Sequence, residues 1–357
     1  MSLHHIAKSL IVMELAFGLL ASNAIGAEYP APKEGSWTAK DFKFHTGDVM
    51  DIRLHYRTVG EPTGIPLVVL HGTGGSGASM LTPSFAGELF GEGQPLDAKK
   101  YFVILPDAVG HGKSSKPSDG LKTRFPAYNY ADMVDAQYRL VAEGLGIKHV
   151  RLVLGNSMGG MNAWLWGTKY PNYVDAIAPM ASQPTPMAAR NYMMRKIMLE
   201  TIRQDPEYAN GNYTKQPGIV KYASIFYSLA TAGGTLNFQK LAPTAAQADR
   251  LVTARLAAPF PADANDFVWA WQSSADYDPS PDLEKIEARV LAINAADDER
   301  NPPETGLTEA AMKRVKNGTL LLIPASQQTS GHATTGNAKF YASAIRDLLA
   351  AAPKRNM

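Results

Sequence analysis

The chain has 357 residues, of which 45% are hydrophobic and 19% charged, and its formal net charge is +2 at pH 7. This composition excludes a disordered chain and a coiled coil, and the scattered charges form no basic surface for nucleic acid. The chain has no cysteine, which excludes disulfides, thiolate nucleophiles and cysteine metal sites, so we expect a globular protein whose partner is a small molecule.

Residues 1–27 have the order of a secretory signal peptide. Lys8 precedes the apolar run Leu10 to Ala21, and small residues follow between Ala24 and Ala27. We therefore predict export to the periplasm or the medium, with cleavage near Ala24 to Ala27. No stable membrane insertion is expected afterwards, because the run is too short to span a bilayer. An uncleaved anchor and a buried N-terminal helix are the alternatives, and Glu14 inside the run argues against export.

The next segments predict strands. Asp41 to Gly60 alternates apolar and polar residues around a Thr-Gly-Asp turn, which is typical of two strands. Six short continuous apolar runs then appear: Pro66 to Gly72, Tyr101 to Asp107, Val150 to Gly155, Val174 to Ala181, Arg289 to Ala295 and Thr319 to Ala325. Strands that are apolar on both faces are buried on both faces, so these runs favour a parallel sheet covered by helices.

Helical patterns lie between these strands. From Tyr130 to Gly146 apolar residues recur at helical spacing and end at a glycine stop. The alternation predicts an α/β fold with a mostly parallel sheet flanked by helices. Between Ser182 and Asp282 no strong strand pattern occurs, and helical patterns rich in Met and aromatic residues take its place. We expect residues 182–282 to form an inserted helical cap over a core made of residues 28–181 and 283–357.

A candidate nucleophile follows the third buried strand. Residues 155–159, GNSMG, match G-x-S-x-G between an apolar strand and a helical pattern, which is the context that a nucleophile elbow requires. The turn is so tight that bulky residues at Gly155 and Gly159 would clash, whereas Ser157 is exposed at its tip. The N-terminus of the helix adds positive potential where an oxyanion would form. The alternative is a glycine-rich turn whose serine has no catalytic role.

A serine hydroxyl needs a base, and in this arrangement the chain order is serine, acid, histidine. His332 alone of the eight histidines follows Ser157, in a loop just after a predicted strand, so it is the expected base. The acid should follow the strand that ends at Ala295, where Asp297 and Asp298 both lie. Asp298 is preferred because a rigid Asn-Pro-Pro turn follows it, and Asp297 stays open because loop register is not readable from one sequence.

The oxyanion hole should combine the amide of Met158 with a second amide from the loop His71 to Gly77. We expect Thr73 to supply it, with Gly74 as the alternative. Neither this loop nor Gly110 to Ser115 has the complete pattern of a phosphate-binding P-loop. The histidines lack H-E-x-x-H spacing, so we predict neither a metal nor a cofactor.

With these residues the sequence resembles the α/β-hydrolase superfamily and, more narrowly, the homoserine O-acetyltransferase family. The resembling segments are LDAKKYFVILPDAVGHGKSS, FPAYNYADMVDAQYRLVAEGLGI, GNSMGGMNAW and DDERNPPE. The resemblance implies an α/β-hydrolase fold and assigns Ser157, Asp298 and His332 to a catalytic triad.

Three departures from that family favour water over a second metabolite as the acyl acceptor. Ala333, Thr334 and Thr335 follow His332 where the family typically has Asp-Phe, and the arginine-rich substrate signature of the family's cap is not found in residues 182–282. An exported enzyme would also lack acetyl-CoA.

We therefore predict an exported serine hydrolase that cleaves a carboxylic ester, or alternatively an amide or lactone, through an acyl-enzyme. The apolar cap favours a hydrophobic or aromatic portion in this small-molecule substrate. Two alternatives remain: an acyltransferase of the homoserine O-acetyltransferase type, and a non-catalytic ligand-binding protein that retains the fold.

Overall fold

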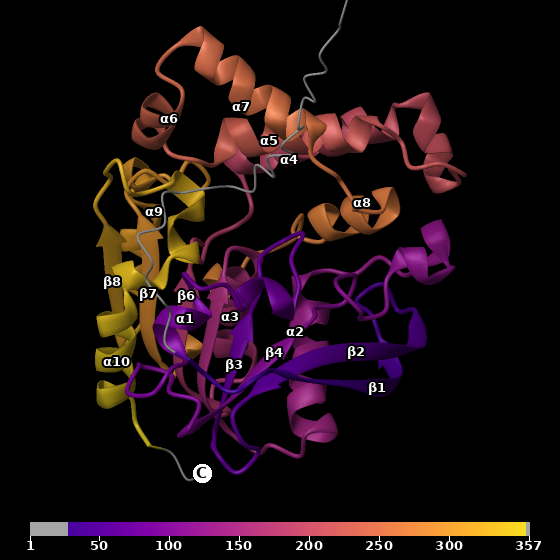
Figure 1. Ribbon diagram of the computed structural model, residues 1–357. Helices are drawn as coiled ribbons and strands as arrows, with labels where there is room; N and C mark the ends of the chain where they lie inside the picture. The colour runs from indigo at the N-terminus through magenta and orange to yellow at the C-terminus, as the bar shows by residue number, and fades with distance from the viewer. Residues whose placement is uncertain (1–27, 355–357) are drawn as a thin grey trace, which may run out of the picture.

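An eight-stranded mixed sheet forms the centre of the computed structural model, which describes residues 28–354 (Figure 1). The strands are β1 (Lys33–Lys43), β2 (Val49–Val59), β3 (Ile65–Leu70), β4 (Tyr101–Pro106), β5 (Val150–Asn156), β6 (Val174–Met180), β7 (Arg289–Ala295) and β8 (Gly318–Ile323). Their order is β1-β2-β4-β3-β5-β6-β7-β8. β1 pairs antiparallel with β2 and β2 antiparallel with β4, whereas all other pairs are parallel. This topology confirms the predicted α/β fold.

Helices cover both faces of the sheet, and a further group lies beyond one end of it (Figure 1). The helices of the described residues are α1 (Ala86–Leu89), α2 (Tyr130–Arg139), α3 (Met158–Lys169), α4 (Ala189–Arg203), α5 (Ile219–Thr231), α6 (Thr235–Leu241), α7 (Ala245–Ala257), α8 (Ala264–Gln272), α9 (Leu307–Met312) and α10 (Ala342–Ala351). Successive strand residues point to opposite faces: Leu67 and Val69 pack in a cluster with residues of α1 and α10, whereas Val68 and Leu70 pack in a cluster with residues of α2, α3 and α9. Continuous apolar runs are therefore needed wherever a strand is covered on both sides.

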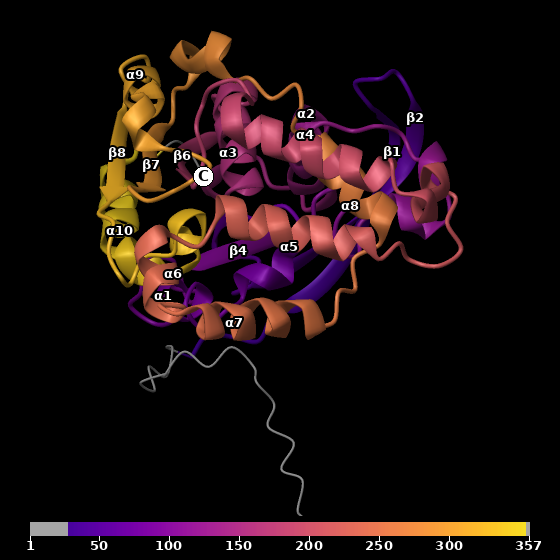
Figure 2. The ribbon, with the colours of Figure 1, turned by 90° about the horizontal axis from the view of Figure 1, so that it is seen from above.

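The helices α4 to α8 form the inserted helical region, and Figure 1 shows α4 to α7 beyond one end of the sheet. Seen from above in Figure 2, α4 and α5 run beside each other across the body, with α7 next to α5. Part of the region has its own apolar cluster, which includes Met198, Tyr227 and Trp271. Two of the Met and aromatic residues of this region, Met193 and Phe226, are 58% and 66% exposed.

The predicted signal peptide, residues 1–27, lies outside the described residues. Within residues 28–354, no helix combines the length and the apolar character that a membrane crossing requires.

Candidate active site

Ser157 lies alone between β5, which ends at Asn156, and α3, which begins at Met158. Its backbone has φ 56° and ψ −113°, a conformation that a residue with a side chain rarely adopts. Its amide donates to the carbonyl of Met180 on the neighbouring strand at 2.9 Å, which anchors the turn. The sequence thus folds locally into a sharp strand-to-helix turn with a serine at its tip.

The glycines on either side of Ser157 leave no space for side chains. A β-carbon on Gly155 would lie 2.0 Å from the carbonyl oxygen of Gly159, and one on Gly159 would lie 2.3 Å from that of Leu70. Real β-carbons do not approach backbone atoms so closely, so the turn would have to open to admit either side chain. This is the physical reason for the glycines of the motif.

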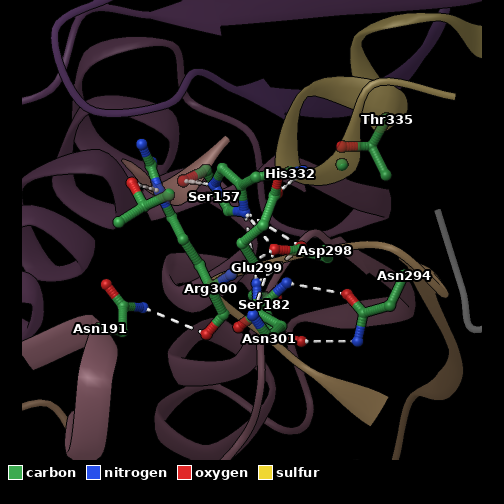
Figure 3. A network of polar contacts seen from close by, with 12 residues as sticks. Ser157, Ser182, Asn191, Asn294, Asp298, Glu299, Arg300, Asn301, His332 and Thr335 are labelled. Carbon is green, nitrogen blue, oxygen red and sulfur yellow. Dashed lines mark hydrogen bonds and ion pairs between the residues drawn. The ribbon is translucent and has the colours of Figure 1, made fainter. Parts of the chain in front are cut away.

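The structure brings Ser157, His332 and Asp298 together in a hydrogen-bonded chain (Figure 3). The distance from Ser157 Oγ to His332 Nε2 is 2.9 Å, and His332 Nδ1 lies 3.0 Å from each carboxylate oxygen of Asp298. Ser157 and His332 are each 7% exposed and Asp298 is 2% exposed. Three residues from three separate loops therefore meet with the distances that proton transfer from the serine requires.

The turn after β7 holds Asp298 in place. The backbone amides of Arg300 and Asn301 donate to Asp298 Oδ1 at 2.8 and 3.1 Å, and Asn301 Nδ2 donates to Oδ2 at 2.9 Å. Asp297, the alternative acid, instead accepts from Thr329 Oγ1 at 2.7 Å and from the amide of Gly331 at 3.3 Å. Asp297 thus braces the loop before His332, while Asp298 faces the imidazole.

Burial, neighbouring charges and hydrogen bonds shift the pKa values of His332 and Asp298. Burial lowers the pKa of His332 below its ordinary value; the carboxylate of Asp298 opposes this, and the cation of Arg300 adds to it. Burial alone would raise the pKa of Asp298, but the charge of His332 and the hydrogen bonds from His332 and Asn301 hold it below the usual value. A neutral imidazole beside a charged carboxylate is the state from which a histidine can accept a proton.

The loop that carries His332 is fastened to its neighbours. His332 is the second residue of a short helical turn, Gly331–Gly336. In the same turn, Thr335 Oγ1 donates to Asn156 Oδ1 at 2.6 Å. The amide of His332 donates to Glu299 Oε2 at 3.2 Å. Sequence reasoning noticed Thr335 only as a departure from a family pattern. In the structure it joins the histidine loop to the residue before Ser157.

The predicted oxyanion residues are Met158, which directly follows Ser157, and Thr73, whose neighbour Gly72 lies close to Ser157. Met158 is the first residue of α3, so its amide has no acceptor within the helix. Thr73 follows β3, and a β-carbon on its neighbour Gly72 would lie 3.5 Å from Ser157 Cβ. Gly72, Thr73 and Asn156 contribute to the lining of a cavity of about 310 Å³. The position of both residues suits oxyanion donors, and that role stays a prediction.

Two arginines near these groups were missed by sequence reasoning. Arg195 on α4 is 1% exposed, and Arg300 directly follows the Asp298-Glu299 pair. Arg300 lines a second, small cavity of about 30 Å³ together with Met161, Gln183 and Asn301. Arginine is common on protein surfaces, so only the tertiary structure distinguishes these two.

Residues 28–354 contain no group of three or more His, Asp or Glu side chains arranged to hold a metal ion. The polar side chains of the site, His332 and Asp298, form a hydrogen-bonded chain with Ser157.

Comparisons with known proteins identify the fold family of the chain. The family model described as "alpha/beta hydrolase fold" matches residues 65–326, which is more than half of the chain. A "Probable acyltransferase" of Methanothermobacter thermautotrophicus is 27% identical over 74% of this chain and 82% of its own length. A "Homoserine O-acetyltransferase" of Nautilia profundicola is 35% identical over only 39% of each chain, so the chain spans well under half of that relative.

Solved structures of two named activities match the same fold. A homoserine O-acetyltransferase from Bacillus anthracis covers 90% of this chain and 98% of its own, with a TM-score of 0.73 and 20% identity. An acetylester hydrolase from Corynebacterium glutamicum covers 89% of this chain and 96% of its own, with a TM-score of 0.76 and 19% identity. At such identities the likeness concerns the fold alone, and together with the family match it shows that the chain belongs to the α/β-hydrolase fold family, where it is related in sequence to homoserine O-acetyltransferases.

Proposed function

We propose that this protein is a serine hydrolase that cleaves a carboxylic ester through an acyl-enzyme. The observation that supports it best is the hydrogen-bonded chain from Ser157 Oγ through His332 to Asp298, with distances of 2.9 and 3.0 Å. Few arrangements other than nucleophilic catalysis need a serine in a strained turn, a neutral buried imidazole and a buried carboxylate in this order.

In the proposed reaction, Ser157 Oγ attacks the ester carbonyl while His332 Nε2 takes its proton. The amides of Met158 and Thr73 would hold the oxyanion, and Asp298 would orient His332 and stabilise its charged form. Collapse of the tetrahedral intermediate breaks the ester bond, and the alcohol leaves with the proton from His332. His332 then activates a water, which attacks the acyl-enzyme and releases the acid and Ser157.

Acyl transfer to a small alcohol or amine is the second candidate, because the curated relatives described above are named acyltransferases. The two candidates differ only in the molecule that attacks the acyl-enzyme. The loop after His332 differs from the transferase pattern, since Thr335 there is bound to Asn156. That difference favours water as the acceptor.

The test is turnover of p-nitrophenyl esters of increasing acyl length by the purified protein and by its Ser157→Ala variant, with and without homoserine as a competing acceptor. Hydrolysis that is lost in the variant and unaffected by homoserine would support the esterase. Turnover that requires the acceptor would establish acyl transfer. Equal rates in both proteins would exclude Ser157 as the nucleophile, and ligand binding without any turnover would favour a non-catalytic binding protein.

We also propose that the protein is exported, on the pattern of residues 1–27. Expression of the full chain in a bacterial host, followed by fractionation and N-terminal sequencing, tests this. A periplasmic product that begins near residue 25–28 is the expected result, and a cytoplasmic product that retains its first residues would contradict it.

A further inference from the structure

The turn after β7 contacts the cap as well as the catalytic groups. The guanidinium group of Arg190 on α4 donates to the carbonyl of Glu299 at 3.3 Å, and Asn191 Nδ2 donates to the carbonyl of Arg300 at 3.5 Å. Arg300 Nε in turn donates to Oγ1 of Thr231, the last residue of α5, at 3.1 Å. The turn that carries the acid of the triad is therefore bonded to two helices of the cap.

Directly after α5 the chain passes through two glycines whose backbone conformation other residues rarely adopt. Gly233 has φ 126° and Gly234 has φ 73°, and α6 begins at Thr235. The amide of Gly233 donates to the carbonyl of Ser330 at 3.1 Å. Residues 232–234, which we call the cap linker, therefore lie beside the loop that carries His332.

One carboxylate joins the cap linker to His332. Glu299 Oε1 accepts from the amide of Gly234 at 2.7 Å, and Glu299 Oε2 accepts from the amide of His332 at 3.2 Å. Figure 3 shows Glu299 beside Asp298 and His332. Hydrogen bonds to a charged acceptor are stronger than those between neutral groups. Glu299 therefore connects a segment of the cap with the backbone of the candidate base.

Glycines allow this close approach. A β-carbon on Gly331, the residue before His332, would lie 2.1 Å from Glu299 Oε2. A β-carbon on Gly234 would lie 2.7 Å from Asp297 Oδ2 and 2.8 Å from the amide nitrogen of Gly331. Side chains at these two positions would push the cap linker and the histidine loop away from the turn after β7. The two hydrogen bonds of Glu299 thus depend on the absence of side chains there.

Glu299 acts on the backbone of His332 and not on its ring. It is not among the lining residues of the cavity of about 310 Å³ or of the cavity of about 30 Å³. Asp298 accepts from the imidazole, whereas Glu299 accepts from the amide of the same residue. Two consecutive carboxylates therefore hold His332 at two different points.

We propose that Glu299 is a positioning residue that fixes the backbone of His332 and couples its placement to the cap linker. The inference rests on the proposed function, because it concerns the base of the same reaction. Displacement of the linker would remove the Gly234 amide from Glu299 and leave the carboxylate with one of its two bonds. The cap then influences the base through Glu299 without supplying a member of the triad.

The kinetic test uses two substitutions of Glu299. Glu299→Gln keeps the shape of the side chain but leaves a single oxygen to accept, so one of the two amides faces an NH2 group. We expect kcat for a p-nitrophenyl ester to fall about 10-fold in Glu299→Gln and about 10- to 100-fold in Glu299→Ala. KM should stay within about twofold, because His332 serves both acylation and deacylation and Glu299 lines neither cavity.

The matched control is Glu304, an exposed residue that follows the same strand. Glu304→Gln should leave kcat and KM unchanged. An unchanged kcat in Glu299→Ala, or a higher KM at unchanged kcat, would overturn the positioning role of Glu299.

Hydrogen exchange followed by mass spectrometry tests the connection without any substrate. In Glu299→Ala, segments 231–238 and 329–336 should both exchange about 10-fold faster, because the amides of Gly234 and His332 lose their acceptor. Segment 150–156, which is β5, should keep its protection. Faster exchange in only one of the two segments would contradict the connection. Faster exchange in β5 as well would mean that Glu299 only supports the fold, and would refute the proposal.

A variant in the cap linker tests the coupling from the other end. A β-carbon on Gly233 would lie 2.3 Å from the ring of Phe238, so Gly233→Ala should displace the linker. We expect this change to lower kcat by about fivefold in the native protein but by about twofold at most in Glu299→Ala, where the carboxylate no longer transmits the displacement. Equal losses in the two backgrounds would show that the linker and the base are independent.

The exchange and kinetic measurements separate this inference from the proposed function. If esters are hydrolysed but neither kcat nor hydrogen exchange responds to Glu299→Ala, the positioning role is wrong and the esterase stands. If hydrogen exchange responds in both segments but no ester is turned over, the proposed function fails and the connection from the cap linker through Glu299 to His332 stands.

Discussion

The body and the cap bury their side chains very differently. The central strands β3 to β7 are almost wholly buried, and the side chains of Trp164 and Trp166 on α3 are fully enclosed. In the cap, large apolar side chains reach the surface: Met193, Ile197, Tyr222, Phe226, Leu236 and Leu241 are all between 47% and 66% exposed. The cap nevertheless buries Arg195, the kind of side chain that is usually outside.

The difference in burial between the body and the cap corresponds to different contributions to the site. The body places Ser157 and Asp298 just after β5 and β7, which are buried strands, and His332 in the loop after β8. Close packing therefore determines the positions of Ser157 and Asp298, and hydrogen bonds join His332 to both. The cap region adds a charge next to that site without supplying any member of the triad. The proposed function therefore places its chemistry in the body. The predictions below test this division, beginning with the largest effect.

Asp298→Asn should lower kcat for a p-nitrophenyl ester by about 10⁴-fold, because the imidazole loses the carboxylate that orients it and stabilises its charge. Asp297→Asn is the matched control. Its amide oxygen can still accept from Thr329 and Gly331, so a change of less than about 10-fold is expected. Steady-state kinetics of both variants decides the matter, and a larger loss at Asp297 would reverse the assignment of the acid.

Gly155→Ala should lower the free energy of unfolding by about 1–3 kcal/mol, because its β-carbon would overlap the Gly159 carbonyl. In the cap, Gly218 has φ −61° and ψ −31°. A β-carbon added to Gly218 would have its nearest neighbour at 4.0 Å. Gly218→Ala should therefore stabilise by about 0.4–1 kcal/mol. Urea unfolding measures both, and changes of the same sign would show that the elbow is less tightly packed than the distances indicate.

Thr335→Val should reduce kcat by about fivefold, since it removes a hydrogen bond of about 1 kcal/mol that joins the histidine loop to Asn156. Thr335→Ser keeps the hydroxyl and should restore most of the rate. The exposed Thr46 belongs to the turn before β2, and Thr46→Val should have no effect on kcat. A serine variant as slow as the valine variant would point to packing of the methyl group instead of the hydrogen bond.

The smallest effect concerns pH. Burial lowers the pKa of His332 below its ordinary value of 6.5, so kcat/KM for a neutral ester should rise with pH on a limb centred below 6.5. Arg300 contributes to this lowering, and removal of a nearby cation favours the protonated imidazole. In Arg300→Met the limb should therefore move to higher pH. Arg250 is an exposed residue of α7, and Arg250→Met should leave the limb in place. A shift to lower pH would show that Arg300 does not act on His332 through its charge.

Much of this architecture follows from the amino-acid sequence. Continuous apolar runs predicted the strands β3 to β8, because a strand covered on both faces needs apolar residues at every position. The expected burial was wrong for β8, which lies at the edge of the sheet and is only partly buried. The run of glycines around Ser157 predicted the elbow, because the backbone there leaves no space for a β-carbon. His332 could be selected because no other histidine follows Ser157 in the chain.

Other features depended on the tertiary structure. One residue separates Asp297 from Asp298, and only the fold of the loop decides which carboxylate faces His332. The role of Thr335 depends on a contact with Asn156, which is 179 positions away. Arg195 and Arg300 are far apart in the sequence and unremarkable in their local patterns, but the cap brings them together over one tryptophan ring. Local sequence determines strands, turns and their glycines through short-range sterics, whereas the partner of a side chain is decided by long-range packing, which no local pattern encodes.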